Sequence, residues 1–90
     1  MEKSALIGLH GKRDLRVGLK EQFGKAGYTV IDVTQEPDEM IRFAETRNYD
    51  RYLMDLNLGS SNSPDITPAI RVYELVRGRV ESGEAKFVGI

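Results

Sequence analysis

The alternation of short apolar segments with amphipathic segments constrains the fold more than any other feature of this sequence. Four segments are apolar or β-branched, as is typical of buried strands: residues 5–9, 28–33, 51–56 and 85–90. Between them lie three segments in which apolar residues recur at helical spacing. Strands that alternate with helices of about 12 residues form parallel sheets with right-handed crossovers. We therefore predict an α/β fold, an open parallel sheet of four strands with three helices on its two faces.

Capping and turn residues indicate where the three helices begin and end. Asp14 is expected to cap the first helix, which stops at Gly27. Pro37 suits the first turn of the second helix, and Thr67 with Pro68 begins the third. The helical stripes comprise Leu15, Leu19, Phe23 and Ala26 in the first helix, Met40, Phe43, Ala44 and Arg47 in the second, and Ile70, Tyr73, Val76 and Val80 in the third.

Length, charge and cysteine content exclude several classes of protein. Ninety residues form one domain around one core, so a catalytic domain with its own substrate cleft is not expected and we predict no enzyme activity. A net charge of -1 with interleaved signs offers no basic field for nucleic acid or anionic lipid. The absence of cysteine excludes disulfides and thiolate metal sites and suits the cytoplasm. The N-terminal apolar run, about six residues, is too short for a signal peptide or membrane span.

Asp55 is the most informative single residue. It lies among the apolar residues Leu53, Met54, Leu56 and Leu58, where burial of a carboxylate is costly without a partner or a task. In open α/β sheets, ligands bind beyond the carboxyl ends of the strands, and Asp55 is expected at such an end. The alternative is a structural carboxylate, either bonded to neighbouring loop amides or solvated at the strand tip.

Three motifs resemble the response-regulator receiver domain of two-component signalling, which has a flavodoxin-like fold. They are Gly-Tyr-Thr-Val at 27–30, Asn-Tyr-Asp at 48–50 and, above all, Leu-Met-Asp-Leu-Asn-Leu-Gly at 53–59. The resemblance spans nearly the whole chain. It implies that Asp55 is the phosphoacceptor and that a histidine kinase or phosphotransfer protein is the partner in a phosphorelay.

The resemblance also implies a magnesium site, which this sequence supplies incompletely. Receivers carry an acidic pair after the first strand, where this chain has His10 and Gly11. The implied metal ligands are Asp55, the backbone carbonyl of Asn57 and, as a substitute, His10, so we expect magnesium to bind weakly or not at all. Asp14 lies a few residues on and could in principle substitute as a metal ligand, but its expected capping role gives a sufficient structural explanation. His10 has two further interpretations, a solvated loop residue and a pH-sensitive partner of Asp55. Asn57 has one further interpretation, a loop residue that accepts unusual backbone angles.

A second departure concerns the parts of a receiver that follow the fourth strand. The family's Thr or Ser after that strand, its Lys after a fifth strand, and the last helices have no counterpart before Ile90. Residues 1–90 are therefore expected to form one receiver-like domain, the N-terminal four-fifths. An unpaired edge strand and an uncovered sheet face would favour a homodimer, with residues 57–65 as a hinge for exchange of elements.

Three functions compete at this point. The first is a receiver-type signalling domain with Asp55 as phosphoacceptor, a degenerate metal site and a truncated switch. The second is a phosphorylation-independent dimerisation or protein-interaction module with the receiver fold. The third is a small ligand-binding domain that uses the crevice near His10 and Asp55 without turnover. No dinucleotide or Walker motif and no Ser-His-Asp arrangement is present. Arg71, Arg77 and Arg79 with Tyr73 could suggest a nucleic-acid face, but a solvated helix flank accounts for them.

Overall fold

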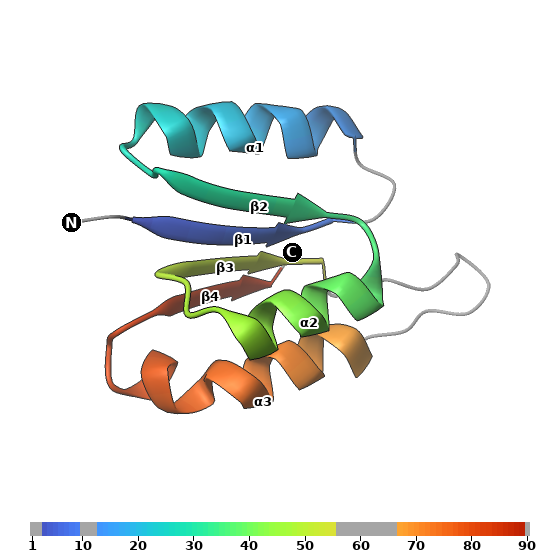
Figure 1. Ribbon diagram of the computed structural model, residues 1–90, viewed down its shortest axis with the longest axis vertical. Coiled ribbons are helices and arrows are strands. Elements are labelled where there is room, and N and C mark those ends of the chain that lie inside the picture. The colour runs from blue at the N-terminus through green and yellow to red at the C-terminus, as the bar shows by residue number, and fades with distance from the viewer. Residues whose placement is uncertain (1–2, 10–12, 56–66, 90) are drawn as a thin grey trace.

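The computed structural model describes residues 3–9, 13–55 and 67–89, and it confirms the predicted α/β fold (Figure 1). Strands and helices alternate along these residues. Their bounds are β1 (Ser4–Gly8), α1 (Arg13–Lys25), β2 (Val30–Thr34), α2 (Pro37–Thr46), β3 (Arg51–Met54), α3 (Thr67–Glu81) and β4 (Lys86–Gly89). The predicted loop at 57–65 and the residues His10 and Asn57 lie outside the described residues.

The four strands form one parallel sheet with the order β2-β1-β3-β4. Ile7 of β1 lies beside Val33 of β2 on one side and beside Leu53 of β3 on the other, and Leu53 lies beside Val88 of β4. The chain thus places β2 on one side of β1 and β3 on the other. The strand order reverses between β1 and β3, which is where parallel α/β sheets form their ligand crevices.

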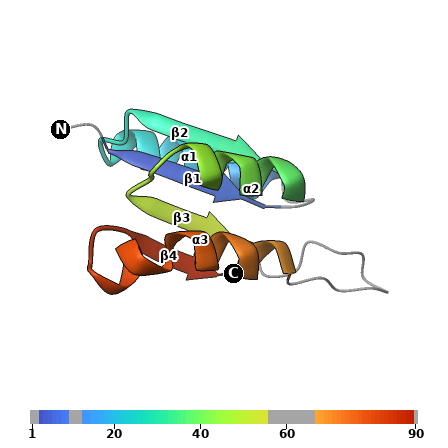
Figure 2. The ribbon, with the colours of Figure 1, turned by 60° about the horizontal axis from the view of Figure 1, so that its bottom comes forward.

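Most of the core lies between the sheet and the two helices α2 and α3. Figures 1 and 2 show these two helices together on one face, with α1 on the opposite face. The buried residues of this core are Leu6, Met40, Ala44, Tyr49, Tyr52, Met54, Ala69, Val72, Val76 and Ala85. Because the three strand residues Leu6, Tyr52 and Met54 point to this face, the alternate residues point toward α1.

The face that carries α1 is covered less completely. Helix α1 packs over β2 and has no fully buried residue (Figure 1). On the β3–β4 half of this face, Leu53 is only half-buried and Val88 is 51% exposed. The helices that the structure describes therefore leave apolar surface of β3 and β4 open to solvent.

Glycine is required at three positions for two different reasons. Gly27 and Gly83 follow α1 and α3 with φ of 94° and 85°, a backbone region that side chains disfavour, so the predicted stop at Gly27 is confirmed. Gly8 permits close packing instead. A Cβ at Gly8 would lie 2.5 Å from the sulfur of Met40, so a side chain at residue 8 would require the buried Met40 side chain to move.

Several details of the predicted helices are wrong. Asp14 is not the cap of α1, because the helix already begins at Arg13 and Asp14 is an exposed residue of its first turn. In α3 the buried stripe is Pro68, Ala69, Val72 and Val76, whereas the predicted Ile70 and Tyr73 are 45% and 36% exposed. In α1, Leu15 is 43% exposed and Ala26 follows the helix as an exposed turn residue. Helical spacing alone allowed neighbouring stripes, and tertiary packing selected between them.

A hydrogen-bonded tyrosine pair joins the start of β3 to the last turns of α3. The Tyr52 hydroxyl accepts hydrogen bonds from the Tyr49 backbone N–H (3.0 Å) and from Arg79 (3.1 Å). Arg79 also donates to the Tyr49 carbonyl at 3.0 Å. The Tyr49 hydroxyl donates to Asp32 of β2, whose carboxylate also lies 3.4 Å from Arg47. Burial raises the pKa of Tyr49 above its ordinary value of 10.0, and the hydrogen bond to Asp32 raises it further. Tyr49 is therefore held as a neutral donor.

None of the helices in the described part of the chain is long and apolar enough to cross a membrane.

Candidate functional site at the carboxyl edge of the sheet

Asp55 lies immediately after β3, at the point where the strand order reverses. Its backbone N–H donates to the Gly8 carbonyl at 2.7 Å, which extends the β1–β3 ladder by one residue and fixes its position beside the end of β1. Asp55 is 3% exposed. The carboxylate that the sequence singled out therefore belongs to a buried residue held between the carboxyl ends of the two strands that flank the switch point.

The ends of β1 and β2 are joined by further hydrogen bonds. The Leu9 N–H donates to the Thr34 carbonyl at 3.1 Å, and the Thr34 hydroxyl accepts from the backbone N–H of Glu36 at 3.1 Å. Arg16 of α1 donates to the Leu9 carbonyl at 2.9 Å. Strand ends and helix α1 thus hold the carboxyl edge in one arrangement and bring a guanidinium group to it.

Arg16 and Thr34 were not identified from the sequence. Arg16 lies near the start of α1, where the expected role of a polar residue is solvation. Thr34 ends β2 and is 6% exposed, and its hydroxyl ties the strand to the beginning of α2. Both line a cavity of about 330 Å³ at this edge, together with Val33, Gln35, Glu36 and Glu39. No local motif distinguishes these residues, because they meet only through the strand register.

The implied magnesium ligands are only partly placed by the structure. Asp55 is described, whereas His10 and Asn57 fall outside the described residues. Asp14 is exposed in the first turn of α1, which gives no support to its substitution for a metal ligand. Within residues 3–9, 13–55 and 67–89, no three His, Cys, Asp or Glu residues gather as a metal-binding group. Of the three implied ligands, the described residues therefore include only Asp55.

The burial of Asp55 is compatible with a structural or a chemical role. Among the described residues, every fully buried side-chain nitrogen or oxygen has a hydrogen-bond partner. A buried carboxylate with partners is a stable element of a fold, whereas an isolated one would be costly. The same carboxylate at the carboxyl edge is also placed where α/β domains carry out their chemistry.

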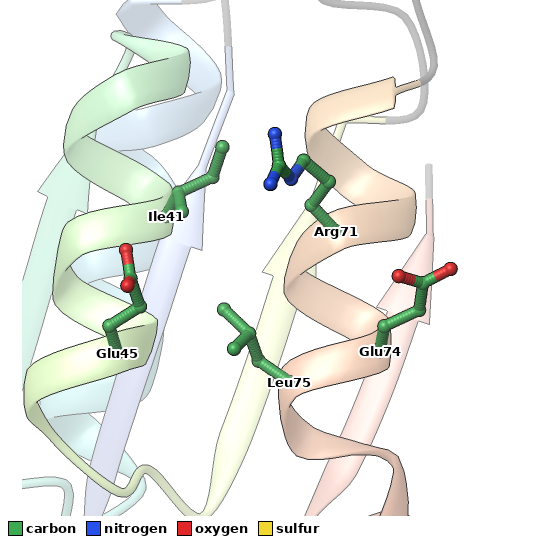
Figure 3. A pocket seen from close by; sticks show the side chains of 5 residues that line it. All are labelled: Ile41, Glu45, Arg71, Glu74 and Leu75. Atoms are coloured by element: carbon green, nitrogen blue, oxygen red, sulfur yellow. The ribbon is translucent and has the colours of Figure 1, made fainter.

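A groove between α2 and α3 is a separate feature (Figure 3). It is lined by the apolar residues Ile41 and Leu75 and by the charged residues Glu45, Arg71 and Glu74. The groove has a volume of about 240 Å³ and shares no lining residue with the cavity at the carboxyl edge. Apolar residues with a solvated charged rim are ordinary for two packed surface helices, so this groove adds nothing to the site at Asp55.

The fold and the site together define a parallel α/β domain with a buried aspartate at its switch point. Comparison of the chain with protein-family models, with curated proteins and with solved structures found no match. Functional inference therefore depends on the residues of the chain and on the resemblance carried by its motifs.

Proposed function

We propose that this chain is a receiver-type signalling domain of a two-component system in which Asp55 is the phosphoacceptor. The observation that carries the proposal is the position of Asp55, directly after β3 and hydrogen-bonded through its N–H to the end of β1. The motif at 53–59 supports the same role by resemblance. A histidine kinase or phosphotransfer protein of the cytoplasm would be the donor.

In such a reaction the Asp55 carboxylate oxygen attacks phosphorus, and the bond from phosphorus to the donor breaks, which leaves an acyl phosphate on Asp55. The anionic oxygens of the carboxylate and of the phosphoryl group approach one another, so positive charge near the site lowers the barrier. Bound magnesium would supply that charge in a complete receiver. In this chain no three described His, Cys, Asp or Glu residues gather as a metal-binding group, and the Arg16 guanidinium at the same edge is hydrogen-bonded to the Leu9 carbonyl. We therefore expect slow phosphorylation.

Incubation with acetyl phosphate and magnesium tests this proposal. Intact-mass spectrometry should detect little or no stable phosphorylation of the unmodified chain, and any phosphoryl group should be absent from Asp55→Asn. Asp50→Asn is the matched control, because Asp50 precedes β3 at the opposite end of that strand. Label that persists in Asp55→Asn would exclude Asp55 as the acceptor, and robust stoichiometric labelling would show that His10 and Gly11 do not impair the site.

The second candidate is a phosphorylation-independent module that forms a homodimer. Strand β4 is an edge of the described sheet, and Val88 is 51% exposed on the face that α1 leaves open. Exposed edges and apolar patches favour association, and a two-fold pair is the commonest closed assembly. This candidate requires no chemistry at Asp55.

Sedimentation equilibrium across the micromolar range tests the second candidate. A dimer is expected, and Val88→Lys should shift it toward monomer. Phe87→Lys is less suitable, because the Phe87 ring packs on Tyr52 and Tyr73 and the change would damage the core. Ile70→Lys is the control, since Ile70 is similarly exposed but belongs to the opposite face. A folded monomer at every concentration would reject this candidate.

A further inference from the structure

The amino edge of the sheet, opposite to Asp55, carries a cluster of cations around a cavity. The cavity has a volume of about 260 Å³, and its lining consists of Lys3, Tyr28, Asp50, Arg51, Gly83, Glu84, Ala85 and Lys86. Three of these side chains are cationic and come from the segment before β1, from β3 and from β4. They are far apart in sequence and meet only because the strands are parallel and in register.

The strand register places two of the cations on the same face. Arg51 and Lys86 are direct neighbours across β3 and β4, so both side chains point toward the face that carries α1. Tyr28 organises the group. Its hydroxyl accepts a hydrogen bond from Arg51 Nε at 2.8 Å, and its ring lies 5.8 Å from the Lys3 ammonium. Because Arg51 is held through Nε, its other two nitrogens remain available as a fork for an anion.

The carboxylates that line the cavity are engaged elsewhere. Asp50 accepts hydrogen bonds from the backbone N–H of Ser4 at 2.9 Å and from its hydroxyl at 3.4 Å. Glu84 lies 3.7 Å from Arg79. None of the three cations forms an ion pair with a described residue. Three cations that pair with no described carboxylate therefore line one cavity in a chain whose net charge is -1.

We propose that this cavity binds a small phosphate-type oxyanion, either free or at the end of a small organic molecule. Arginine and lysine together are the side chains that recognise phosphate, the first as a planar fork and the second as a point charge. The cavity is slightly smaller than the roughly 300–1,000 Å³ of pockets for drug-sized ligands, which suits a small anion. The site is independent of Asp55, because it lies at the other end of the strands.

Titration of the ¹⁵N-labelled chain with inorganic phosphate and with phenyl phosphate, at constant ionic strength, tests this site. We expect saturable shifts of the Tyr28, Arg51 and Lys86 amide signals. Equal affinity for the two probes indicates a free oxyanion as the ligand, and tighter binding of phenyl phosphate indicates an organic phosphate ester. Asp55→Asn should bind both probes as the unmodified chain does.

The variants Lys86→Gln and Lys3→Gln, alone and combined, test the assignment of residues. Both side chains are exposed, so the fold should tolerate the changes, and the double variant should lose affinity about ten-fold or more. The double variant Lys20→Gln with Lys25→Gln removes the same two charges from exposed positions of α1 outside the cavity and should bind normally. Absence of saturable binding by either probe, or equal affinity in the two double variants, would overturn the proposal.

Discussion

Removal of a single hydroxyl group from Tyr52 should destabilise the whole domain. Tyr52 is 1% exposed, and its hydroxyl is the acceptor for the Tyr49 backbone N–H at 3.0 Å. Tyr49 is 0% exposed, so in Tyr52→Phe this N–H would remain buried without an acceptor. Arg79 would lose one bond of 3.1 Å but would keep its bond to the Tyr49 carbonyl.

The magnitude follows from the cost of a buried unsatisfied donor. That cost is about 1–3 kcal/mol, and phenylalanine preserves the ring contacts of Tyr52 with Tyr49 and Phe87. We therefore expect Tyr52→Phe to lower the free energy of unfolding by about 2 kcal/mol, a large part of the roughly 5–15 kcal/mol available to a domain.

Urea denaturation, followed by circular dichroism, measures this loss. Tyr73→Phe is the matched control, because the Tyr73 ring also packs on Phe87, whereas its hydroxyl has no hydrogen bond within the described residues. The control should change the unfolding free energy by less than about 0.5 kcal/mol. If the two variants unfold at the same urea concentration with the same slope, the Tyr52 hydroxyl does not join β3 to α3 as described.

Three further predictions concern the core, alkaline pH and metal binding. Gly8→Ala should destabilise the fold by about 1–3 kcal/mol in urea, because its Cβ would meet the Met40 sulfur; unchanged stability would contradict this packing. The fold favours the neutral form of Tyr49, whose pKa is raised. The contribution of Tyr49 to the free energy of unfolding is therefore complete below about pH 10 and is lost as pH rises further. Urea unfolding measured across that pH range should show a smaller loss of unfolding free energy for Tyr49→Phe than for the unmodified chain. Equal losses would contradict this role of Tyr49. Calorimetry should detect weak magnesium binding and tighter zinc or nickel binding that His10→Ala reduces; tight magnesium binding unaffected by that change would exclude His10.

The sequence was sufficient to predict the fold, because the alternation of strand and helix segments admits few other arrangements. It also predicted the stop at Gly27, where only glycine adopts the observed φ without strain, and the location of Asp55 at a strand end. It was right for Val76 and Val80 of the α3 stripe and wrong for Ile70 and Tyr73, since Ile70 and Ala69 both fit helical spacing and only packing against the sheet selects Ala69. The spacing of apolar residues indicates a helix, but it does not determine which of two adjacent apolar residues faces the sheet.

The cluster at the amino edge could not be predicted for a different reason. Lys3, Arg51 and Lys86 are isolated cations in sequence, and no local motif joins them. They gather because Arg51 and Lys86 are register partners and because Tyr28 holds both Arg51 and Lys3. Arg16 and Thr34 at the carboxyl edge escaped prediction in the same way, since their partners are backbone groups of other segments.

The central proposal is that Asp55 is a phosphoacceptor whose metal site lacks an acidic pair. The double variant His10→Asp, Gly11→Asp supplies that pair and should restore magnesium binding and phosphorylation by acetyl phosphate. Intact-mass and peptide analysis should then show near-stoichiometric label on Asp55, which the additional change Asp55→Asn abolishes, while the unmodified chain remains almost unlabelled. A folded double variant that binds magnesium and still acquires no phosphoryl group on Asp55 would contradict the proposal.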